Sequence, residues 1–554
     1  MFNFKKLNEI KRSRQIMHVM VKYGLDYFID RSKIGFSLKI RKKPRSYQKL
    51  AMPERLRLAL EELGPTFVKF GQTLSARPDF IPPAFIKELE KLQDRVPPFS
   101  SFCAQKIIEK ELNKPLKELF KKFETVPVAS ASLSQVHKAT LFNNEIVAVK
   151  IQRPHIKEII ELDIRILEKL AGFFENRIHN SLVYQPKLIV AEIKKTIRKE
   201  IDFTNDAYNF EKFRINFKDV EYIKVPKIYW EMSTTKVLTM EFIEGTKVNE
   251  ITQDKYKNVF EAKKVAKQGA DAILKQILED GFFHADPHPA NILVQPPDTI
   301  VMLDAGMVGY LDEKTTLSGA KLLRAIIDKD SDQVINNLEK LGVIIKEFDK
   351  NLFRQDLKEL LDRYLGVPLK NLEISKVSQD IFRIMIQHHL VLPSNLVLMI
   401  KALSTVETTG RQLDPDFDMV SATKPFVKNL LRKKFSPREL LGKSNTILQE
   451  SVELIEQLPR DLTDILRKVK EGKLKFNFKH QGLEKLTMEI DRSSNRLSFS
   501  LIIAALIIGS SLILQQKTGP FILGYSALGI IGYILASFLG LGLIISILKS
   551  GKWK

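Results

Sequence analysis

The stretch that decides the fold lies between residues 284 and 306. It begins with His284-Ala285-Asp286-Pro287-His288-Pro289-Ala290-Asn291 and ends with Asp304-Ala305-Gly306. Between them, Asn291-Ile292-Leu293-Val294 and Ile300-Val301-Met302-Leu303 predict two short strands around a Pro296-Pro297 turn. An aspartate and an asparagine on one loop can face a hydroxyl group and a cation together, while a second carboxylate arrives from the neighbouring hairpin. The stretch therefore predicts an oxygen-rich site for Mg²⁺ beside a reacting hydroxyl group.

A lysine and an acidic residue precede this stretch. The apolar residues change from a helical to a twofold period over residues 126–151. Near the end of this segment, Ala148-Val149-Lys150 predicts an apolar strand that ends at a lysine. Glu200 follows on a predicted helix. A lysine supplies a point charge that neutralises phosphate oxygens as they move. Each feature is common alone, but their order ahead of Asp286 and Asp304 indicates one site.

This order resembles that of protein kinases, which place a strand lysine, a helix acid, a catalytic-loop aspartate and a metal-binding Asp-x-Gly along the chain. Two departures narrow the resemblance: an alanine- and serine-rich loop replaces the Gly-rich loop, and no Ala-Pro-Glu segment follows Asp304. With Lys69-Phe70-Gly71-Gln72 upstream and the Glu200-Ile201-Asp202 motif, residues 50–420 resemble the UbiB family of atypical kinase-like proteins. Ser130 and Ser134 differ from the alanine and glycine of some relatives, which leaves the preference between ATP and ADP open.

The resemblance implies an α+β, atypical protein-kinase-like bilobal fold with an N-terminal helical extension, plus a C-terminal two-helix transmembrane hairpin. We predict six consecutive parts: a basic amphipathic N-terminal segment (1–50), a helical extension with the Lys-x-Gly-Gln motif (51–125), a kinase-like N-lobe (126–245), a kinase-like C-lobe (246–420), an amphipathic helical linker (421–496) and two transmembrane helices (497–548).

The resemblance also implies roles for individual residues. The candidate catalytic residues are the base Asp286, the phosphate-binding Lys150 and Lys69, and the metal ligands are Asn291 and Asp304. Glu200 is the expected helix partner of Lys150, while Lys69 and Gln72 would reach toward Asp202 and the nucleotide as a gate. The residues expected to bind nucleotide are Gln72, Ala129, Ser130, Ala131, Ser132, Lys150, Glu200, Asp202 and, at the adenine, Glu241 and Phe242.

His284 and His288 flank the candidate base, so a metal site at His-x-Asp-x-His is an alternative for this loop. Mg²⁺ prefers oxygen to imidazole ligands, and the first histidine of a kinase-like loop acts as scaffold. We therefore expect both histidines to be structural.

The function implied is support of isoprenoid quinone biosynthesis, usually of ubiquinone, by a membrane-associated protein that uses ATP or ADP with Mg²⁺. Because the family's extension occludes the cleft where a peptide would lie, the resemblance favours ATP hydrolysis and small-molecule or lipid handling over protein phosphorylation. The alternative is a non-catalytic, nucleotide-gated scaffold or lipid-handling module for quinone-biosynthesis enzymes. The expected partners are membrane lipids, isoprenoid quinone precursors and those enzymes.

The charge distribution favours a membrane over nucleic acid. The 554 residues carry a net charge of +22, and residues 1–50 hold 14 Lys and Arg against three acidic residues. No nucleic-acid-binding motif is visible, and anionic lipid accounts for the charge at least as well. Two alternatives stay open for residues 1–50: a helix lying on the membrane and a solvated basic helix packed on the body. The single cysteine, Cys103, excludes an internal disulfide or a cysteine-based metal site.

Two uncharged stretches near the C-terminus, Leu497–Leu514 and Thr518–Leu548, are long enough to span a bilayer as a hairpin. Basic residues flank both outer ends, so the positive-inside rule predicts that the body and both termini lie in the cytoplasm. The hairpin resembles that of the bacterial members of the family, which implies a bacterial inner membrane. Small residues at Ala505/Gly509 and Ala536/Gly540 suggest helix contact and a homodimer as a weak hypothesis. The amphipathic linker before them is either solvated or lies on the membrane.

Overall fold

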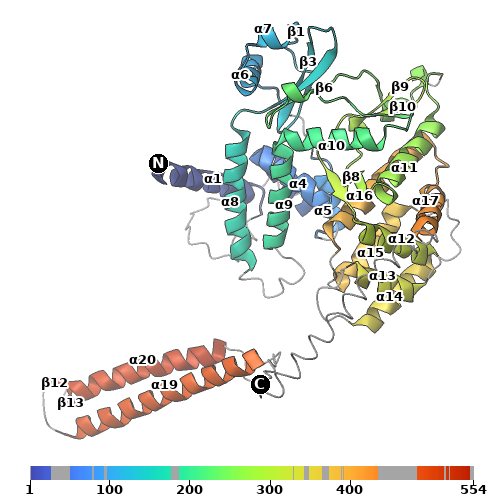
Figure 1. Ribbon diagram of the computed structural model, residues 1–554. Helices are drawn as coiled ribbons and strands as arrows, with labels where there is room; N and C mark the ends of the chain where they lie inside the picture. Colours follow the sequence, from blue (N-terminus) through green and yellow to red (C-terminus); the bar gives the residue numbers. More distant parts are fainter. Residues whose placement is uncertain are drawn as a thin grey trace, which may run out of the picture. The chain divides into compact units, whose positions relative to one another are not determined.

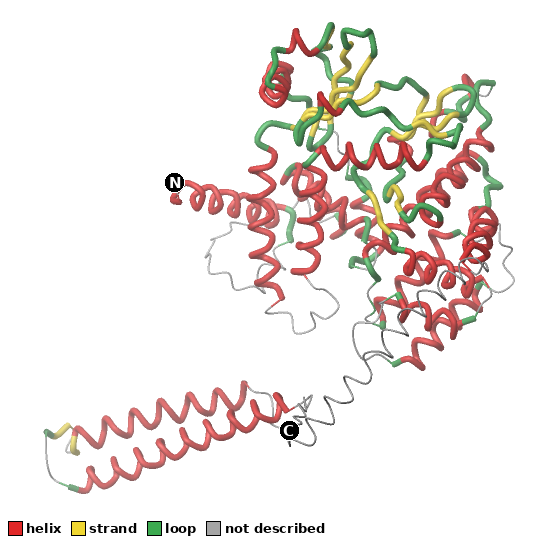
Figure 2. Tube along the Cα trace, in the orientation of Figure 1, coloured by secondary structure: helices red, strands yellow, loops and turns green. Residues whose placement is uncertain are grey.

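The structure is a computed structural model of the chain. It describes residues 2–25, 50–77, 80–92, 96–175, 186–256, 258–327, 330–341, 349–364, 373–388, 390, 392–434, 483–516, 520–522 and 525–549. The chain forms two compact units, residues 1–442 and 443–554. Among these residues, the first unit contains the three larger groups of strands and most of the helices, and the second contains two long helices with a short strand pair (Figures 1 and 2).

The first helices of this unit form the N-terminal extension. Proline begins α3 (Met52–Leu63) and α4 (Pro65–Ser75), and between them Gly64 adopts a φ of 94°, which favours glycine at a helix end. Pro82-Pro83 starts α5 (Pro83–Leu89). The apolar faces of α3 and α4 pack with α8 (Ile156–Glu175) and α9 (Pro186–Ile201) in one buried cluster.

The helix α1 (Phe2–Lys22) belongs to the same cluster, because Ile16 and Val19 are buried in it. The Arg12 guanidinium donates to both carboxylate oxygens of buried Asp163 on α8, at 2.7 and 2.9 Å, and to the Leu63 carbonyl. For residues 2–25 the structure therefore favours the helix packed on the body. Residues 26–49 lie outside the described part of the chain.

The first sheet contains five strands: β1 (Lys122–Phe123), β2 (Ala129–Ser130), β3 (Ser134–Thr140), β4 (Ile146–Gln152) and β6 (Val237–Glu241). Their order is β1-β3-β4-β6, with β2 paired to β3. Alternation along β4 buries Val147, Val149 and Ile151 in a cluster with α6 (Ser101–Leu112) and α7 (Leu116–Leu119). Lys150 therefore lies on the opposite face, next to α10 (Phe203–Asn216).

The second sheet has the order β5 (Ile223–Lys224), β10 (Thr299–Met302), β9 (Ile292–Gln295) and β7 (Thr246–Lys247). The β9–β10 hairpin is the one predicted around Pro296-Pro297. A separate pair, β8 (Phe282–His284) and β11 (Val308–Tyr310), carries the start of the His284–Asn291 loop. Four short 3₁₀ turns connect these strands: η2 (Trp230–Met232), η3 (Val248–Glu250), η4 (Asp254–Tyr256) and η5 (Pro289–Asn291).

Helices complete this unit. The largest buried cluster joins the second sheet to α10, α11 (Ala262–Leu278) and α16 (Ser394–Leu413). Four more helices lie around them: α12 (Glu313–Ile327), α13 (Ser331–Lys340), α14 (Lys350–Arg363) and α15 (Ile374–Gln387). The helix α17 (Met419–Lys434) is the described beginning of the predicted linker, of which residues 435–482 lie outside the described part. The predicted α+β kinase-like fold with a helical extension is confirmed.

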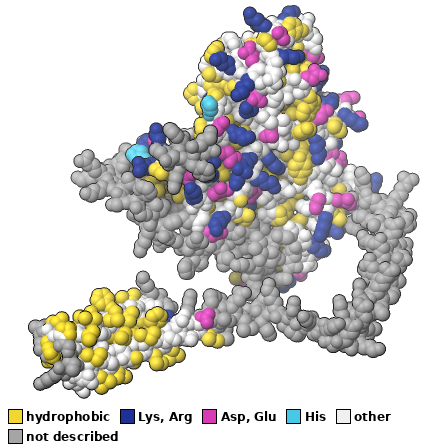
Figure 3. All heavy atoms as spheres, turned by 60° about the vertical axis from the view of Figure 1, so that its left-hand side comes forward, with side chains coloured by type: hydrophobic (Ala, Val, Ile, Leu, Met, Phe, Trp, Pro, Cys, Tyr) yellow, Lys and Arg dark blue, Asp and Glu magenta, His cyan; other side chains and the backbone are white. Residues whose placement is uncertain are grey.

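The second unit contains two apolar helices, α19 (Leu483–Gln515) and α20 (Ala527–Lys549). Their segments Ser493–Gln515 and Ala527–Ile547 are long and apolar enough to cross a membrane. Figure 3 shows apolar side chains over the surface of this hairpin, whereas charges of both signs cover the visible part of the first unit. The hairpin therefore fits membrane association.

A short strand pair precedes the second apolar helix. Strands β12 (Phe521–Ile522) and β13 (Tyr525–Ser526) lie in the turn of the hairpin, and α20 starts at Ala527, within the uncharged stretch from residue 518 to residue 548. The two helices meet closely at Gly532, where a β carbon would lie 2.0 Å from the Ser510 hydroxyl oxygen. No atom lies within 4 Å of such a carbon at Gly509 or Gly540, so these two glycines do not form the helix contact within the described chain.

Candidate nucleotide site

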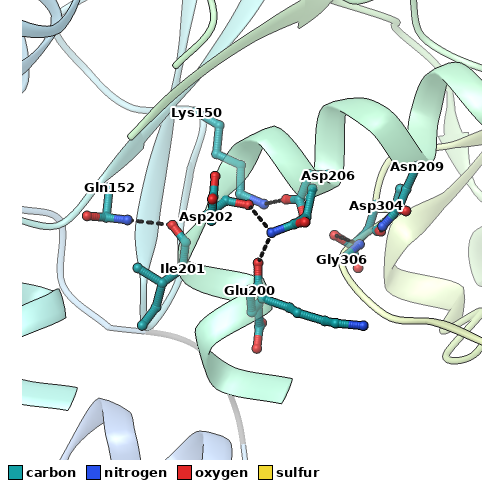
Figure 4. Close-up of polar contacts among 12 residues, drawn as sticks. Lys150, Gln152, Glu200, Ile201, Asp202, Asp206, Asn209, Asp304 and Gly306 are labelled. Carbon is teal, nitrogen blue, oxygen red and sulfur yellow. Dashed lines mark hydrogen bonds and ion pairs between the residues drawn. The ribbon is translucent and has the colours of Figure 1, made fainter. Parts of the chain in front are cut away.

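The centre of the site is an ion pair between Lys150 on β4 and Asp206 in the first turn of α10. The Lys150 ammonium nitrogen lies 2.7 Å from Asp206 Oδ2, and the Asp206 side chain is 2% exposed (Figure 4). The Lys150 nitrogen also lies 4.8 Å from the centre of the Phe203 ring. Burial opposes the charge on Lys150, but Asp206, Asp304 and Glu200 raise its pKa above the usual value.

Two carboxylates face each other across Gly306. A β carbon on Gly306 would lie 3.5 Å from Asp304 Oδ1 and 3.6 Å from Asp206 Oδ1. Burial raises the pKa of Asp206 to about 6; Lys150 opposes this rise and Asp304 adds to it. Burial also acts to raise the pKa of Asp304, but Lys150, His284 and Lys69 bring it below the usual value. Lys150 and Asp304 therefore share one electrostatic environment.

Hydrogen bonds hold the Asp304-Ala305-Gly306 turn in place. The Gly306 amide donates to Asp304 Oδ1 at 3.4 Å, and the Asn209 side chain on α10 donates to the Ala305 carbonyl at 2.8 Å. A ring nitrogen of His284 lies 2.9 Å from the Asp304 carbonyl oxygen. The turn is thus fixed both to α10 and to the candidate catalytic loop.

The candidate catalytic loop is also held through its backbone. The Asp286 amide donates to His284 Nδ1 at 3.1 Å, and the Leu303 amide donates to the Asn291 carbonyl at 3.0 Å. Both ring nitrogens of His284 therefore have partners, and His288 accepts from the Ala290 amide. Within the described ranges, no group of three or more His, Cys, Asp or Glu could hold a metal ion. These contacts favour the structural interpretation of the two histidines.

The predicted pairing of Glu200 with Lys150 is corrected. Glu200 stands near the end of α9 and pairs instead with Lys69 of the extension, at 2.5 Å. The helix α9 ends before Asp202. Asp202 caps the N-terminus of α10, because its carboxylate accepts hydrogen bonds from the amide and the hydroxyl of Thr204. One turn later, Asp206 faces β4 because its neighbours Phe203, Ala207 and Phe210 are buried. That apolar spacing is the signal that could have identified Asp206.

Gln72 also has a different partner from the one expected. Its side-chain amide donates to the Leu92 carbonyl at 3.1 Å, so it stabilises the extension itself, while Asp202 is occupied by Thr204. Lys69 is the extension residue that reaches the site, since it pairs with Glu200 and acts on the charge of Asp304.

The loop Ala129–Ser132 lies in contact with the helical extension. The Ser130 hydroxyl donates to the Val96 carbonyl at 2.7 Å, and Arg153 donates to the Ala131 carbonyl at 2.9 Å. Ser132 is fully buried, and its hydroxyl has no hydrogen-bond partner among the described residues. The extension and the first sheet therefore fix this loop together.

The predicted adenine contacts lie at the end of β6. The amides of Glu241 and Phe242 donate to the Lys227 and Ile146 carbonyls. Contact with an adenine at these two residues would therefore have to use their carbonyl groups.

Comparison with known proteins identifies three matching regions. The ABC1 atypical kinase-like domain matches residues 91–338, the UbiB helical domain residues 357–418, and the ABC1/UbiB kinase-like C-terminal domain residues 481–549. All residues expected to act in the site fall in the first region, except Lys69 and Gln72. Both residues lie in the part of the helical extension that precedes this matched region.

Similar proteins cover most of the chain. A probable protein kinase UbiB of Marinobacter nauticus is 35% identical over 84% of this chain and 86% of its own length. An uncharacterized protein of Clostridium pasteurianum from the hydrogenase 1 5′ region is 32% identical over 98% and 100%. The chloroplastic protein ACTIVITY OF BC1 COMPLEX KINASE 7 of Arabidopsis thaliana is 31% identical over 94% and 73%. The solved structure of a Mycobacterium tuberculosis protein with erythromycin covers 64% of this chain and 90% of that chain at 24% identity, with a TM-score of 0.46. The chain belongs to the ABC1/UbiB family of atypical kinase-like proteins.

Proposed function

We propose that this protein is a membrane-anchored, ATP-dependent atypical kinase or ATPase that supports isoprenoid quinone biosynthesis. The observation that carries the proposal is the convergence of Lys150, Asp206 and Asp304, from three distant parts of the chain, beside the loop of Asp286 and Asn291. A buried lysine among carboxylates is suited to a nucleotide phosphate with its divalent cation.

The oxygen ligands in the site fit Mg²⁺. Asp206 Oδ1 is buried without a hydrogen-bond partner among the described residues, and it faces the Asp304 carboxylate across Gly306. Asp304 and Asn291 would hold the ion, which would neutralise charge on the phosphates.

Lys150 and Asp286 would then have different roles in phosphoryl transfer. Lys150 would exchange Asp206 for a phosphate oxygen and hold it by charge. Asp286 would take the proton of the attacking water or alcohol as its oxygen bonds to the γ-phosphorus. The bond from that phosphorus to the bridging oxygen breaks at the same time, and ADP leaves with both electrons.

Contacts of the extension support a small acceptor or water over a peptide. Arg153 donates to the Pro97 carbonyl at 2.9 Å, and Arg77 donates to the Ser394 hydroxyl of α16 at 3.1 Å. Together with the Lys69–Glu200 pair, these contacts attach the extension at several points around the site. An extended peptide would have to displace them.

The hairpin α19–α20 supports a membrane-soluble substrate or product. Basic residues at its outer ends favour a cytoplasmic body and cytoplasmic termini at the inner membrane of a bacterium. Isoprenoid quinone precursors partition into that bilayer, so the membrane lipids, these precursors and the enzymes that modify them are the partners we propose.

Quinone profiling tests this function. A strain that lacks the protein should accumulate an early prenylated intermediate, and the wild-type chain should restore the quinone while Asp304→Asn should not. An unchanged profile in the deletion strain would remove the pathway from the proposal. Full restoration by Asp286→Asn would favour a nucleotide-gated scaffold instead.

A further inference from the structure

A cation from outside the kinase-like domain lies against the candidate base. Lys401 stands on α16, and its ammonium nitrogen lies 3.2 Å from Asp286 Oδ2. The matched kinase-like domain ends at residue 338, whereas Lys401 falls in the UbiB helical domain, residues 357–418. The helical domain therefore contributes directly to the surroundings of the base.

The position of Lys401 is fixed by its helix. Val397 and Ala402 on α16 are completely buried, and α16 packs along α11 in the main core. The hydroxyl of Ser394, in the first turn of α16, accepts a hydrogen bond from Arg77 of the extension. The Lys401 side chain is 24% exposed and that of Asp286 is 36% exposed, so the pair is open to a ligand on one side.

A second carboxylate lies close to this pair. Glu90, at the C-terminal end of α5, is exposed, and partial desolvation raises its pKa; Lys401 opposes this rise and Asp286 adds to it. The N-terminal extension thus brings Glu90 near Asp286 and Lys401, which lie about 200 and 310 residues later in the sequence. Two carboxylates therefore act electrostatically on Lys401. It forms an ion pair with Asp286 and interacts at longer range with Glu90.

We propose that Lys401 is a positioning residue for phosphoryl transfer, which holds the Asp286 carboxylate and presents a positive charge where the acceptor oxygen meets the γ-phosphate. This inference rests on the proposed function. A carboxylate has two oxygens, and the bond from Lys401 to Oδ2 leaves Oδ1 to receive the acceptor proton. A fixed cation beside the developing charge stabilises the transition state without reorganisation.

The test measures Mg²⁺-dependent ATP turnover and nucleotide affinity of the full chain in lipid nanodiscs. Lys401→Met should lower kcat about 10- to 100-fold, because the base is no longer held in line. The Kd of a fluorescent ADP analogue should change less than about twofold, because Lys401 does not contact the adenine or the ribose in this account. Lys401→Arg keeps the charge, so it should recover most of the turnover.

Two further variants make the result decisive. Lys428→Met on α17 removes an exposed lysine in a neighbouring helix and should leave kcat unchanged. Asp286→Asn should lose turnover. If Asp286→Asn is inactive while Lys401→Met keeps wild-type kcat, the role of Lys401 is wrong and the proposed function stands. If Asp286→Asn and Asp304→Asn both keep wild-type turnover, the proposed function itself fails. An equal loss in Lys401→Met and Lys401→Arg with a lowered Tm would show a structural role only and would also contradict the inference.

Discussion

The Lys150 ammonium group lies 2.7 Å from the Asp206 carboxylate, so the strand lysine is held by the first turn of α10 and not by Glu200. Glu200 is thereby left to Lys69, which connects the extension to the same group of carboxylates. Two lysines and the carboxylates of Glu200, Asp206 and Asp304 act on one another in this site. A nucleotide would enter a site whose charges are already paired.

Breaking the central ion pair should destabilise the protein. Asp206→Asn leaves the half-buried Lys150 without its closest partner, so the free energy of unfolding should fall by about 2 kcal/mol. The double variant Lys150→Met/Asp206→Leu replaces the pair with apolar groups. Its loss of unfolding free energy should be smaller than the sum of the losses in the single variants Lys150→Met and Asp206→Leu. Denaturant unfolding of the full chain in detergent measures both. Additive losses would contradict the pairing.

The carboxyl of Glu90 should make stability depend on pH. Glu90 is exposed, but partial desolvation raises its pKa in the folded protein, so its contribution is present at low pH and is lost as pH rises through the folded pKa. Glu90→Gln should therefore match the wild type at acid pH and exceed it in Tm at neutral pH. Glu221→Gln serves as the control at a second exposed glutamate. A Glu90→Gln advantage that is constant with pH would contradict this assignment.

A side chain at Gly309 on β11 should disrupt the packing of β11 against β8, the strand that leads into the His284–Asn291 loop. A β carbon there would lie 2.1 Å from Phe283 Cζ. Gly309→Ala should lower the free energy of unfolding by about 2 kcal/mol, since the ring must move within a packed core. Gly319→Ala on α12 provides the control, because no atom lies within 4 Å of its added carbon. Equal stability of the two variants would mean that β8 and β11 are not packed as described.

The single cysteine reports the topology. Cys103 is exposed on α6, so a membrane-impermeant maleimide should label it in inside-out vesicles and not in intact spheroplasts. In a Cys103→Ser background, Tyr525→Cys in the turn between α19 and α20 should show the reverse pattern. Labelling of both positions from the same side would rule out a spanning hairpin.

The sequence was sufficient for the parts of the site that lie in short, regular elements. Lys150 at the end of an alternating strand and Asp304 after a hairpin could both be predicted, because strand periodicity and turn residues are local signals. The choice between Glu200 and Asp206 needs more than the apolar spacing of α10. It depends on the break at Asp202, which ends α9 and sets which face of α10 meets β4.

Lys401 was missed for a different reason. It belongs to no motif, and its neighbours on α16 show only that one face of the helix is buried. The contact with Asp286 arises from tertiary packing of α16 against α11, which no periodicity reveals. The β12–β13 turn ahead of α20 could not be predicted either, because an uncharged stretch does not distinguish a helix from a short turn.

Mg²⁺-dependent ATP turnover by the full chain in nanodiscs, compared between wild type and Asp304→Asn, tests the central claim most directly. If Asp304 and Lys150 serve one nucleotide, the substitution should lower turnover about 100-fold or more while the protein stays folded. Turnover by folded Asp304→Asn at the wild-type rate would contradict the assignment of this site.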